Sequence, residues 1–170
     1  MYKVLAIVVL FCSIQSVFAA SDPYIQTVKE MYKLGKKSEE GMQVIELHSD
    51  ASLKQAFNLN ARNGEVCGFE QDVMWQSQDP EFNVPLQFSK VGQNKVKVSL
   101  GKGKWNKQSS VTYILKCNGN DCKVSDVIDS SGSLKKNILA ECWVCKLFLV
   151  CFKILQLCKK RLGYLAFIIA

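Results

Sequence analysis

Acidic residues are absent from both ends of this 170-residue chain. All 15 Asp and Glu lie between residues 21 and 142, although 22 Lys and Arg give the whole chain a net charge of +7. Lys3 and five basic residues after position 143 hold six of those positive charges, which leaves 16 basic against 15 acidic residues in the middle. Because the middle is nearly neutral, the basic balance does not indicate nucleic-acid binding, and we expect no nucleic-acid partner.

The sequence also lacks the short patterns that mark common catalytic sites. It contains no G-x-S-x-G, H-E-x-x-H or Walker phosphate-loop motif. Its one histidine, His48, stands before Ser49 and Asp50, and no pattern supplies it with a nucleophile or an orienting group. We therefore interpret His48 as a surface or capping residue and expect no cofactor and no metal. The alternative is an enzyme that combines His48 with pocket carboxylates such as Asp72.

Residues 1–19 have the features of a secretion signal. Lys3 is followed by an apolar stretch over residues 4–12, and residues 17–19 (Val-Phe-Ala) fit the small-x-small pattern for cleavage after Ala19. The apolar stretch is short for a membrane span, which needs about 20 apolar residues. We expect a periplasmic or secreted mature protein, with an uncleaved anchor as the alternative.

The final segment, residues 143–170, is apolar and carries only basic charges. Lys146, Lys153 and Lys160 are seven residues apart, so a helix would place them near one face, as in helices that lie in a membrane interface. The same charges make the segment a poor membrane span. Three interpretations stay open: a membrane-associated helix, a translated extension outside the fold, and a helix docked on the domain.

The middle segment, residues 20–142, is long enough for one small domain. Apolar spacing predicts a helix over residues 23–37, capped by Asp22, and a shorter helix that starts near Asp50, with residues 58–64 as its turn-rich exit. A change to alternating periodicity then predicts strands, followed by a short helix over residues 133–140; the strands are expected at residues 84–91, 95–100, 110–117 and 122–128. Helices first and an antiparallel meander second indicate the α+β class, with N-terminal helices packed on one face of a curved antiparallel sheet.

Cysteine is the strongest local signal for chemistry. Cys117 and Cys122 flank a four-residue turn and would face each other on neighbouring strands, so in an oxidising compartment we expect a disulfide between them. We expect Cys67 to pair with Cys142. A zinc site formed by Cys117, Cys122, Cys142 and Cys145, and a redox motif at Cys142–Cys145, are the alternatives.

Four residues in expected loops are candidates for ligand binding. Gln71 and Asp72 belong to a polar stretch that is either a pocket rim or a solvated loop. Trp75 and Trp105 lie beside polar residues, where a tryptophan either completes the core or anchors a partner. We expect burial for Trp105, whereas Trp75 fits both interpretations equally.

Several segments together resemble a family of small secreted bacterial proteins of unknown function in the nuclear transport factor 2-like superfamily. Over residues 23–141, the matching segments are 69–72 (Phe-Glu-Gln-Asp), 96–100, the Trp-containing loop 103–105, 111–116, 122–127, and 132–135 (Gly-Ser-Leu-Lys). Cys122 stands where the family strand has Trp. The resemblance implies a cone-like fold with a pocket between a curved sheet and its helices, and a homodimer formed through the sheet. It implies no reaction.

The sequence therefore predicts an exported, non-catalytic binding protein. Its partner is an unknown protein or small ligand, and an immunity-type protein that neutralises a toxin is one concrete form. Membrane contact through residues 143–170 would make it a tethered structural protein instead.

Overall fold

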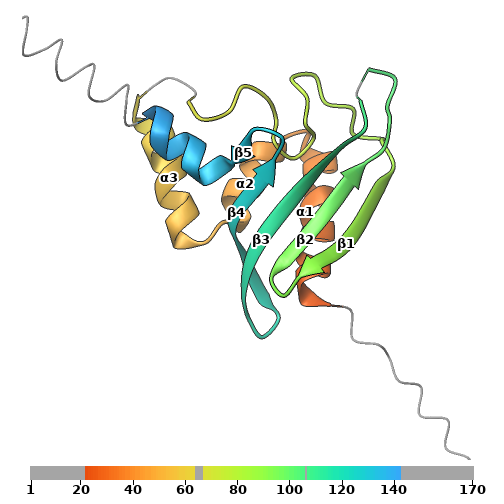
Figure 1. The fold of residues 1–170 in the computed structure, drawn as a ribbon, viewed down its shortest axis with the longest axis horizontal. Helices are drawn as coiled ribbons and strands as arrows, with labels where there is room; N and C mark the ends of the chain where they lie inside the picture. Colours follow the sequence, from red (N-terminus) through yellow and green to blue (C-terminus); the bar gives the residue numbers. More distant parts are fainter. Residues whose placement is uncertain (1–21, 64–66, 106, 143–170) are drawn as a thin grey trace, which may run out of the picture.

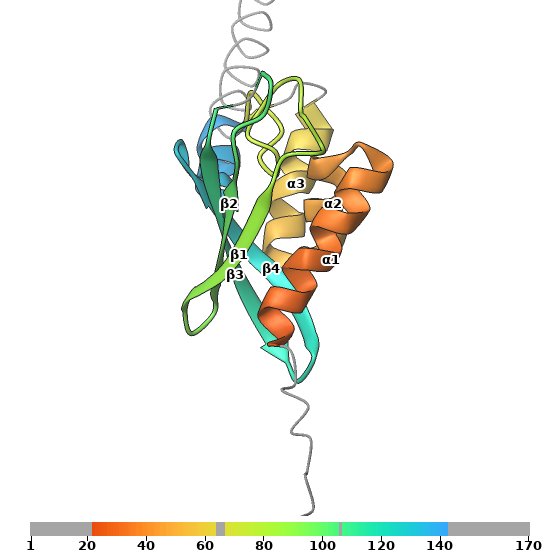
Figure 2. The same ribbon diagram turned by 90° about the vertical axis from the view of Figure 1, so that its right-hand side faces the viewer.

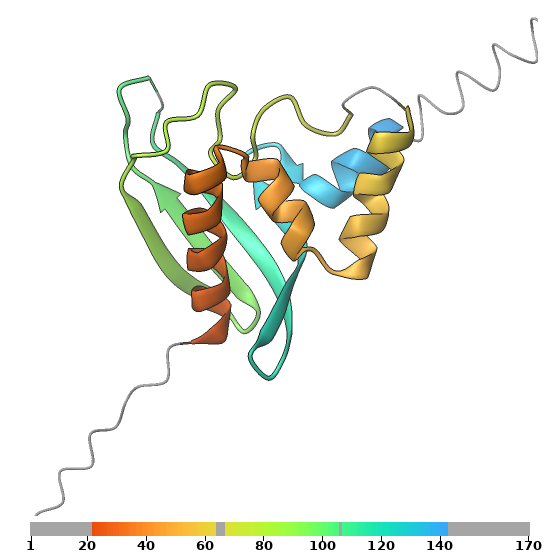
Figure 3. The ribbon, with the colours of Figure 1, turned by 180° about the vertical axis from the view of Figure 1, so that it is seen from behind.

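The computed structural model describes residues 22–63, 67–105 and 107–142. Three helices come first, followed by a five-stranded antiparallel sheet and a final helix over residues 134–142. The predicted α+β class is confirmed, and Figure 2 and Figure 3 show the three first helices on one face of the twisted sheet. The predicted signal segment and the segment 143–170 lie outside the described residues.

The first helix, α1 (Pro23–Ser38), follows the signals in its sequence. The Asp22 side chain accepts hydrogen bonds from the N–H groups of Tyr24 and Ile25, at 2.9 and 3.4 Å, and so caps the helix as predicted. Val28, Met31, Tyr32 and Gly35 are buried, a spacing that places one stripe of α1 against the sheet. Lys36 and Lys37 lie in the last turn, where positive charge complements the helix dipole.

The second helix, α2 (Gly41–His48), is absent from the sequence prediction. It is short, and the side chain of its N-cap residue, Glu40, makes no capping hydrogen bond. The third helix, α3 (Ala51–Asn63), does begin after Asp50, which accepts a 2.9 Å hydrogen bond from the Leu53 N–H. It continues through residues 58–63, so the predicted turn-rich exit was wrong. Leu53, Ala56 and Phe57 in its first half are buried in the core, so tertiary packing supports this part of the helix.

The sheet is a simple meander with strand order β1-β2-β3-β4-β5. The first four strands lie within two residues of the predicted boundaries, and the short β5 was not predicted. The strands are β1 (Leu86–Gly92), β2 (Lys95–Leu100), β3 (Ser109–Asn118), β4 (Asp121–Asp129) and β5 (Gly132–Ser133). Phe88 faces Val98, which faces Val111, so apolar side chains align on the helix-covered face. Register shifts between Lys90 and Gly92 and between Ile114 and Leu115 interrupt the ladder, and such irregularities increase local twist.

Both predicted disulfides are present in the structure. Cys117 faces Cys122 across β3 and β4, and the two are bonded. Cys67 is bonded to Cys142, which ties the start of the segment after α3 to the final helix. These bonds exclude the zinc site expected as an alternative, because two disulfides consume three of its four thiols. They also exclude a Cys142–Cys145 disulfide while Cys142 is bonded to Cys67, and Cys145 lies outside the described residues.

None of the helices within the described residues combines the length and hydrophobicity that crossing a bilayer requires. Two disulfides are consistent with an oxidising, extracellular compartment.

Candidate functional site

Three loops meet at one end of the sheet. In an antiparallel meander every second connection falls at the same end, so the segment before β1, the β2–β3 loop and the β4–β5 turn lie together. Figure 1 shows them at the top of the molecule, opposite the β1–β2 and β3–β4 hairpins. These loops contain all four residues that the sequence suggested for binding.

The segment between α3 and β1 inserts a short apolar turn into the core. Asp72 and Ser77 form an isolated antiparallel bridge, and Val73, Met74 and Trp75 between them are buried. Trp75 is only 1% exposed and packs edge-on against Tyr32, with ring centroids 5.2 Å apart. Trp75 therefore completes the core and is not a binding residue.

Asp72 does not line an open pocket but supports the start of α2. Its Oδ1 accepts a 3.1 Å hydrogen bond from the Trp75 N–H, and the carboxylate also bonds to backbone N–H groups of Gly41 and Met42. Burial raises the pKa of Asp72, although these hydrogen bonds oppose the shift. The interpretation of residues 70–72 as a solvated loop was wrong for Asp72, which caps a helix from a distant part of the chain.

Trp105 lies at the surface, and the expectation of burial was wrong. Its side chain is 75% exposed at the tip of the β2–β3 loop. Glu81 accepts hydrogen bonds from the backbone N–H groups of Lys104, at 2.7 Å, and Trp105, so the loop is tied to the segment before β1 and not to the core. Lys104 Nζ lies 4.6 Å from the centre of the Trp105 ring and covers part of one face.

Two adjoining hollows lie between Trp105 and the final helix, and we call them together the glutamine groove. The first has a volume of about 540 Å³ and the second about 400 Å³, and they share Gln71, Gln78 and Ser130. The first hollow is further lined by Gln76, Ser77, Asp79, Trp105, Lys107 and Ser109. The second is further lined by Gly68, Phe69, Glu70, Ser131, Asn137 and Glu141. The structure therefore brings Gln71 and Trp105 into one site, as two of the four predicted binding residues.

Hydrogen bonds fix the walls of the glutamine groove. Asp129 accepts a hydrogen bond from Gln76 Nε2 at 3.0 Å, and its other oxygen accepts from the backbone and hydroxyl of Ser131 at 2.8 and 2.6 Å. One carboxylate thus connects a residue of the first hollow to a residue of the second. Ser77 Oγ donates to the Asp79 carbonyl at 2.9 Å and accepts from the Asp79 N–H. A site held in this way binds at a lower ordering cost.

Other polar groups of the groove are open to a ligand. Among the residues that the structure describes, the side chains of Gln71, Ser109 and Ser130 make no hydrogen bond to the protein. Gln71 and Ser109 are partly exposed and Ser130 is exposed, so all three are accessible. They offer one amide and two hydroxyl groups, each of which both donates and accepts.

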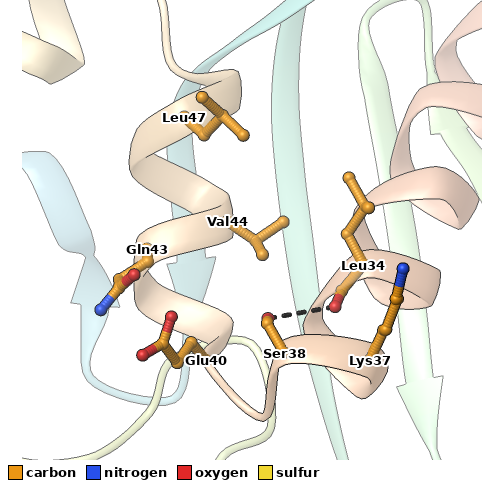
Figure 4. Close-up of a pocket in the computed structure, with 7 residues that line it drawn as sticks. All are labelled: Leu34, Lys37, Ser38, Glu40, Gln43, Val44 and Leu47. Atoms are coloured by element: carbon orange, nitrogen blue, oxygen red, sulfur yellow. Dashed lines mark hydrogen bonds between the residues drawn. The ribbon is translucent and has the colours of Figure 1, made fainter.

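A third hollow, of about 440 Å³, lies between α1 and α2 (Figure 4). Its apolar surface comes from Val44 and from two exposed side chains, Leu34 at 42% and Leu47 at 65% exposure. Leu34 lies on α1 outside its buried stripe and lines this hollow. Lys37, Ser38, Glu40 and Gln43 complete its lining.

His48 and Asp72 are not brought together. Asp72 contacts the first residues of α2, whereas His48 ends that helix, about 10 Å further along its axis. His48 Nδ1 lies 2.9 Å from the Val44 carbonyl of its own helix. Within the described residues, no group of three or more His, Cys, Asp or Glu side chains could hold a metal ion.

Sequence reasoning missed Asp129 as an organiser of the site, and it considered Glu81 only as part of a possible pocket rim or partner surface. Both carboxylates lie in turn-rich sequence and resemble ordinary surface acids. Glu81 acts on a loop 23 residues later, and Asp129 on a side chain 53 residues earlier. The one signal for Glu81 is Gly103, since a side chain there would overlap the Glu81 carboxylate.

Comparison with protein families, with curated proteins and with solved structures found no match for this chain.

Proposed function

We propose that this protein is an exported, non-catalytic binding protein whose ligand occupies the glutamine groove beside Trp105. The exposure of Trp105 is the observation that carries the proposal, because an accessible indole ring offers a large apolar surface with a polar edge that a ligand can cover. Glu81 fixes that loop, so the exposed ring has a defined position.

Export is part of the proposal. The residues that resemble a secretion signal and the two disulfides both support an oxidising compartment, periplasmic or extracellular. Membership of the nuclear transport factor 2-like superfamily, with its cone-like shape, also belongs to the proposal. Its support is the order of elements, with helices first and then a meander whose inner face they cover.

The absence of a reaction is proposed from the groove itself. Its side chains are mainly amides and hydroxyls, and of its carboxylates Glu141 already accepts a 2.7 Å hydrogen bond from the Gly68 N–H. General acid–base catalysis instead needs titratable groups placed at the reacting atoms. The enzyme alternative that relies on His48 and Asp72 is disfavoured by their positions at opposite ends of α2.

A protein ligand is the competing form of this proposal, as in an immunity-type protein that covers a toxin. Such a partner would be expected to bury exposed apolar side chains, and two of these, Leu34 and Leu47, lie together between α1 and α2. A homodimer through the sheet would instead cover its outer face.

Site-specific photo-crosslinking distinguishes these surfaces. A photoreactive phenylalanine replaces Lys107, Leu47 or Gln93 in the full chain, expressed in cells that secrete it, and adducts are identified by mass. Lys107 is exposed and lines the hollow beside Trp105, so Trp105 itself stays in place. Gln93 is the control because it is exposed in the β1–β2 hairpin, at the opposite end of the sheet from the groove. We expect an adduct from position 107 that positions 47 and 93 do not give. Adducts from position 47 alone, or from no position, would contradict the proposal.

A further inference from the structure

The chemistry of the glutamine groove is repeated in its two hollows. Each contains one aromatic side chain, Trp105 in the first and Phe69 in the second. Around each ring lie amide and hydroxyl groups, and the two sets share Gln71, Gln78 and Ser130. A repeated lining suits a ligand that is itself repeated.

We propose that the glutamine groove binds a neutral oligosaccharide, with one part of the chain in each hollow and one sugar ring stacked on Trp105. This inference rests on the function proposed above and names the class of its ligand. Both hollows lie within the range of about 300–1,000 Å³ that is typical of sites for small ligands.

Hydrogen bonding favours a sugar because hydroxyl groups both donate and accept. Amide side chains match adjacent hydroxyls, since one carboxamide offers an oxygen acceptor and two N–H donors. Gln71, Ser109 and Ser130 have these groups unused within the described part of the chain. A fatty or drug-like ligand would need a mainly apolar lining, which this groove does not have.

The indole ring of Trp105 supplies an apolar contact that hydroxyl and amide groups cannot make. A pyranose ring has an apolar face of C–H groups, which stacks on an aromatic surface and buries apolar area. Lys104 covers part of one face of Trp105, yet the side chain is 75% exposed, so most of the ring is accessible.

Charge selects against ionised ligands of both signs. Glu70, Asp79 and Glu141 line the groove against one cation, Lys107, so phosphates and sugar acids meet net negative charge. Lys104 and Lys107 flank Trp105, where a cationic ligand would meet like charge. A neutral oligosaccharide meets neither of these electrostatic repulsions.

The test is binding of the full mature chain to an array of neutral and acidic oligosaccharides, followed by titration of the best neutral one in solution. We expect a neutral oligosaccharide of three or more units to bind at least tenfold more tightly than its monosaccharide. Trp105→Ala and Gln71→Ala should each weaken binding tenfold or more. Leu47→Ala is the matched control and should change binding less than twofold, because Leu47 lies between α1 and α2.

The two proposals fail separately. If position 107 crosslinks a protein while no neutral glycan binds, the binding function stands and the oligosaccharide is wrong. Preference for acidic glycans, or binding that Trp105→Ala leaves unchanged, also overturns the oligosaccharide proposal. If position 107 gives no adduct and no glycan binds, both proposals fail.

Discussion

The carboxylate of Asp72 lies directly against the Cα of Gly41, the first residue of α2, and a methyl group added to Gly41 would overlap its oxygens. Asp72 accepts hydrogen bonds from the backbone N–H groups of Gly41 and Met42 and so performs the capping that Glu40 does not. The start of α2 is therefore specified by a residue 31 positions later in the chain.

We expect Gly41→Ala to destabilise the protein by about 1–3 kcal/mol, since the added methyl group displaces a buried carboxylate. Helix propensity alone would favour alanine by about 1 kcal/mol, so the sign of the change is diagnostic. Urea denaturation gives the free energy of unfolding. Gly92→Ala is the control, because a Cβ at position 92 would have its nearest contact at an ordinary 3.6 Å. A more stable Gly41→Ala protein would contradict this account.

Truncation of the two described tryptophans should affect stability very differently. Trp75 is 1% exposed in the core, so Trp75→Ala should cost about 3–5 kcal/mol of stability. Trp105 is 75% exposed, and Trp105→Ala should change stability by no more than about 0.5 kcal/mol. Thermal and urea unfolding of both variants check the contrast. A comparable loss from Trp105→Ala would mean that its ring packs against the domain.

Glu81 should determine the position of the Trp105 ring. In a protein labelled with 5-fluorotryptophan, Glu81→Ala removes the acceptor for the Lys104 and Trp105 N–H groups, so the fluorine resonance of Trp105 should shift and sharpen. The Trp75 resonance should not change. Glu46→Ala, an exposed acid on α2, is the control and should affect neither resonance. An unchanged Trp105 resonance in the Glu81→Ala protein would show that Glu81 does not position the Trp105 ring.

Asp50 should make stability fall in acid. Partial burial disfavours its charge, but hydrogen bonds from the Leu53 N–H, Ser52 and Lys116 outweigh burial and lower the pKa of Asp50 to about 2. The unfolded chain then takes up a proton first as pH falls, so the contribution of Asp50 is complete above pH 4 and is lost towards pH 2.

Asp50→Asn keeps a capping oxygen and removes the charge. Because Lys116 is 69% exposed, we expect the wild type to be more stable at pH 7 by only about 1 kcal/mol. Denaturation at several pH values should show this difference closing between pH 4 and pH 2. A difference that does not vary with pH would show that the charge of Asp50 is unimportant.

The two disulfides should contribute unequally. Cys67 and Cys142 are separated by 75 residues and Cys117 and Cys122 by 5, so the chain-entropy relation gives about 4 kcal/mol for the first bond and about 2 kcal/mol for the second. Paired Cys→Ser variants, compared by denaturation, measure the two contributions. Equal losses, or a larger loss for the short loop, would show that native packing rather than loop closure dominates.

Short-range sequence patterns predicted most of the helices and strands. Asp22 with Pro23 specifies the start of α1, Asp50 that of α3, and alternating residues such as Val96 and Val98 specify the strands. Each signal acts within a few residues, which is why it can be read without a structure. The helix α2 escaped prediction because its cap lies outside this range.

The chain by itself also indicated the Cys117–Cys122 disulfide, because the spacing places the two residues across a tight turn, and it determined the near neutrality of the domain. The Cys67–Cys142 bond joins residues 75 positions apart, so the tertiary structure decided that pairing. The tertiary structure decided which tryptophan is buried, because a polar residue follows each of them and only the packing against Tyr32 places the Trp75 ring in the core. It also decided that Gln71 and Trp105 share one groove, with Glu81 and Asp129 as its supports. Contacts between residues distant in the sequence depend on how the sheet and helices pack, and no local pattern encodes them.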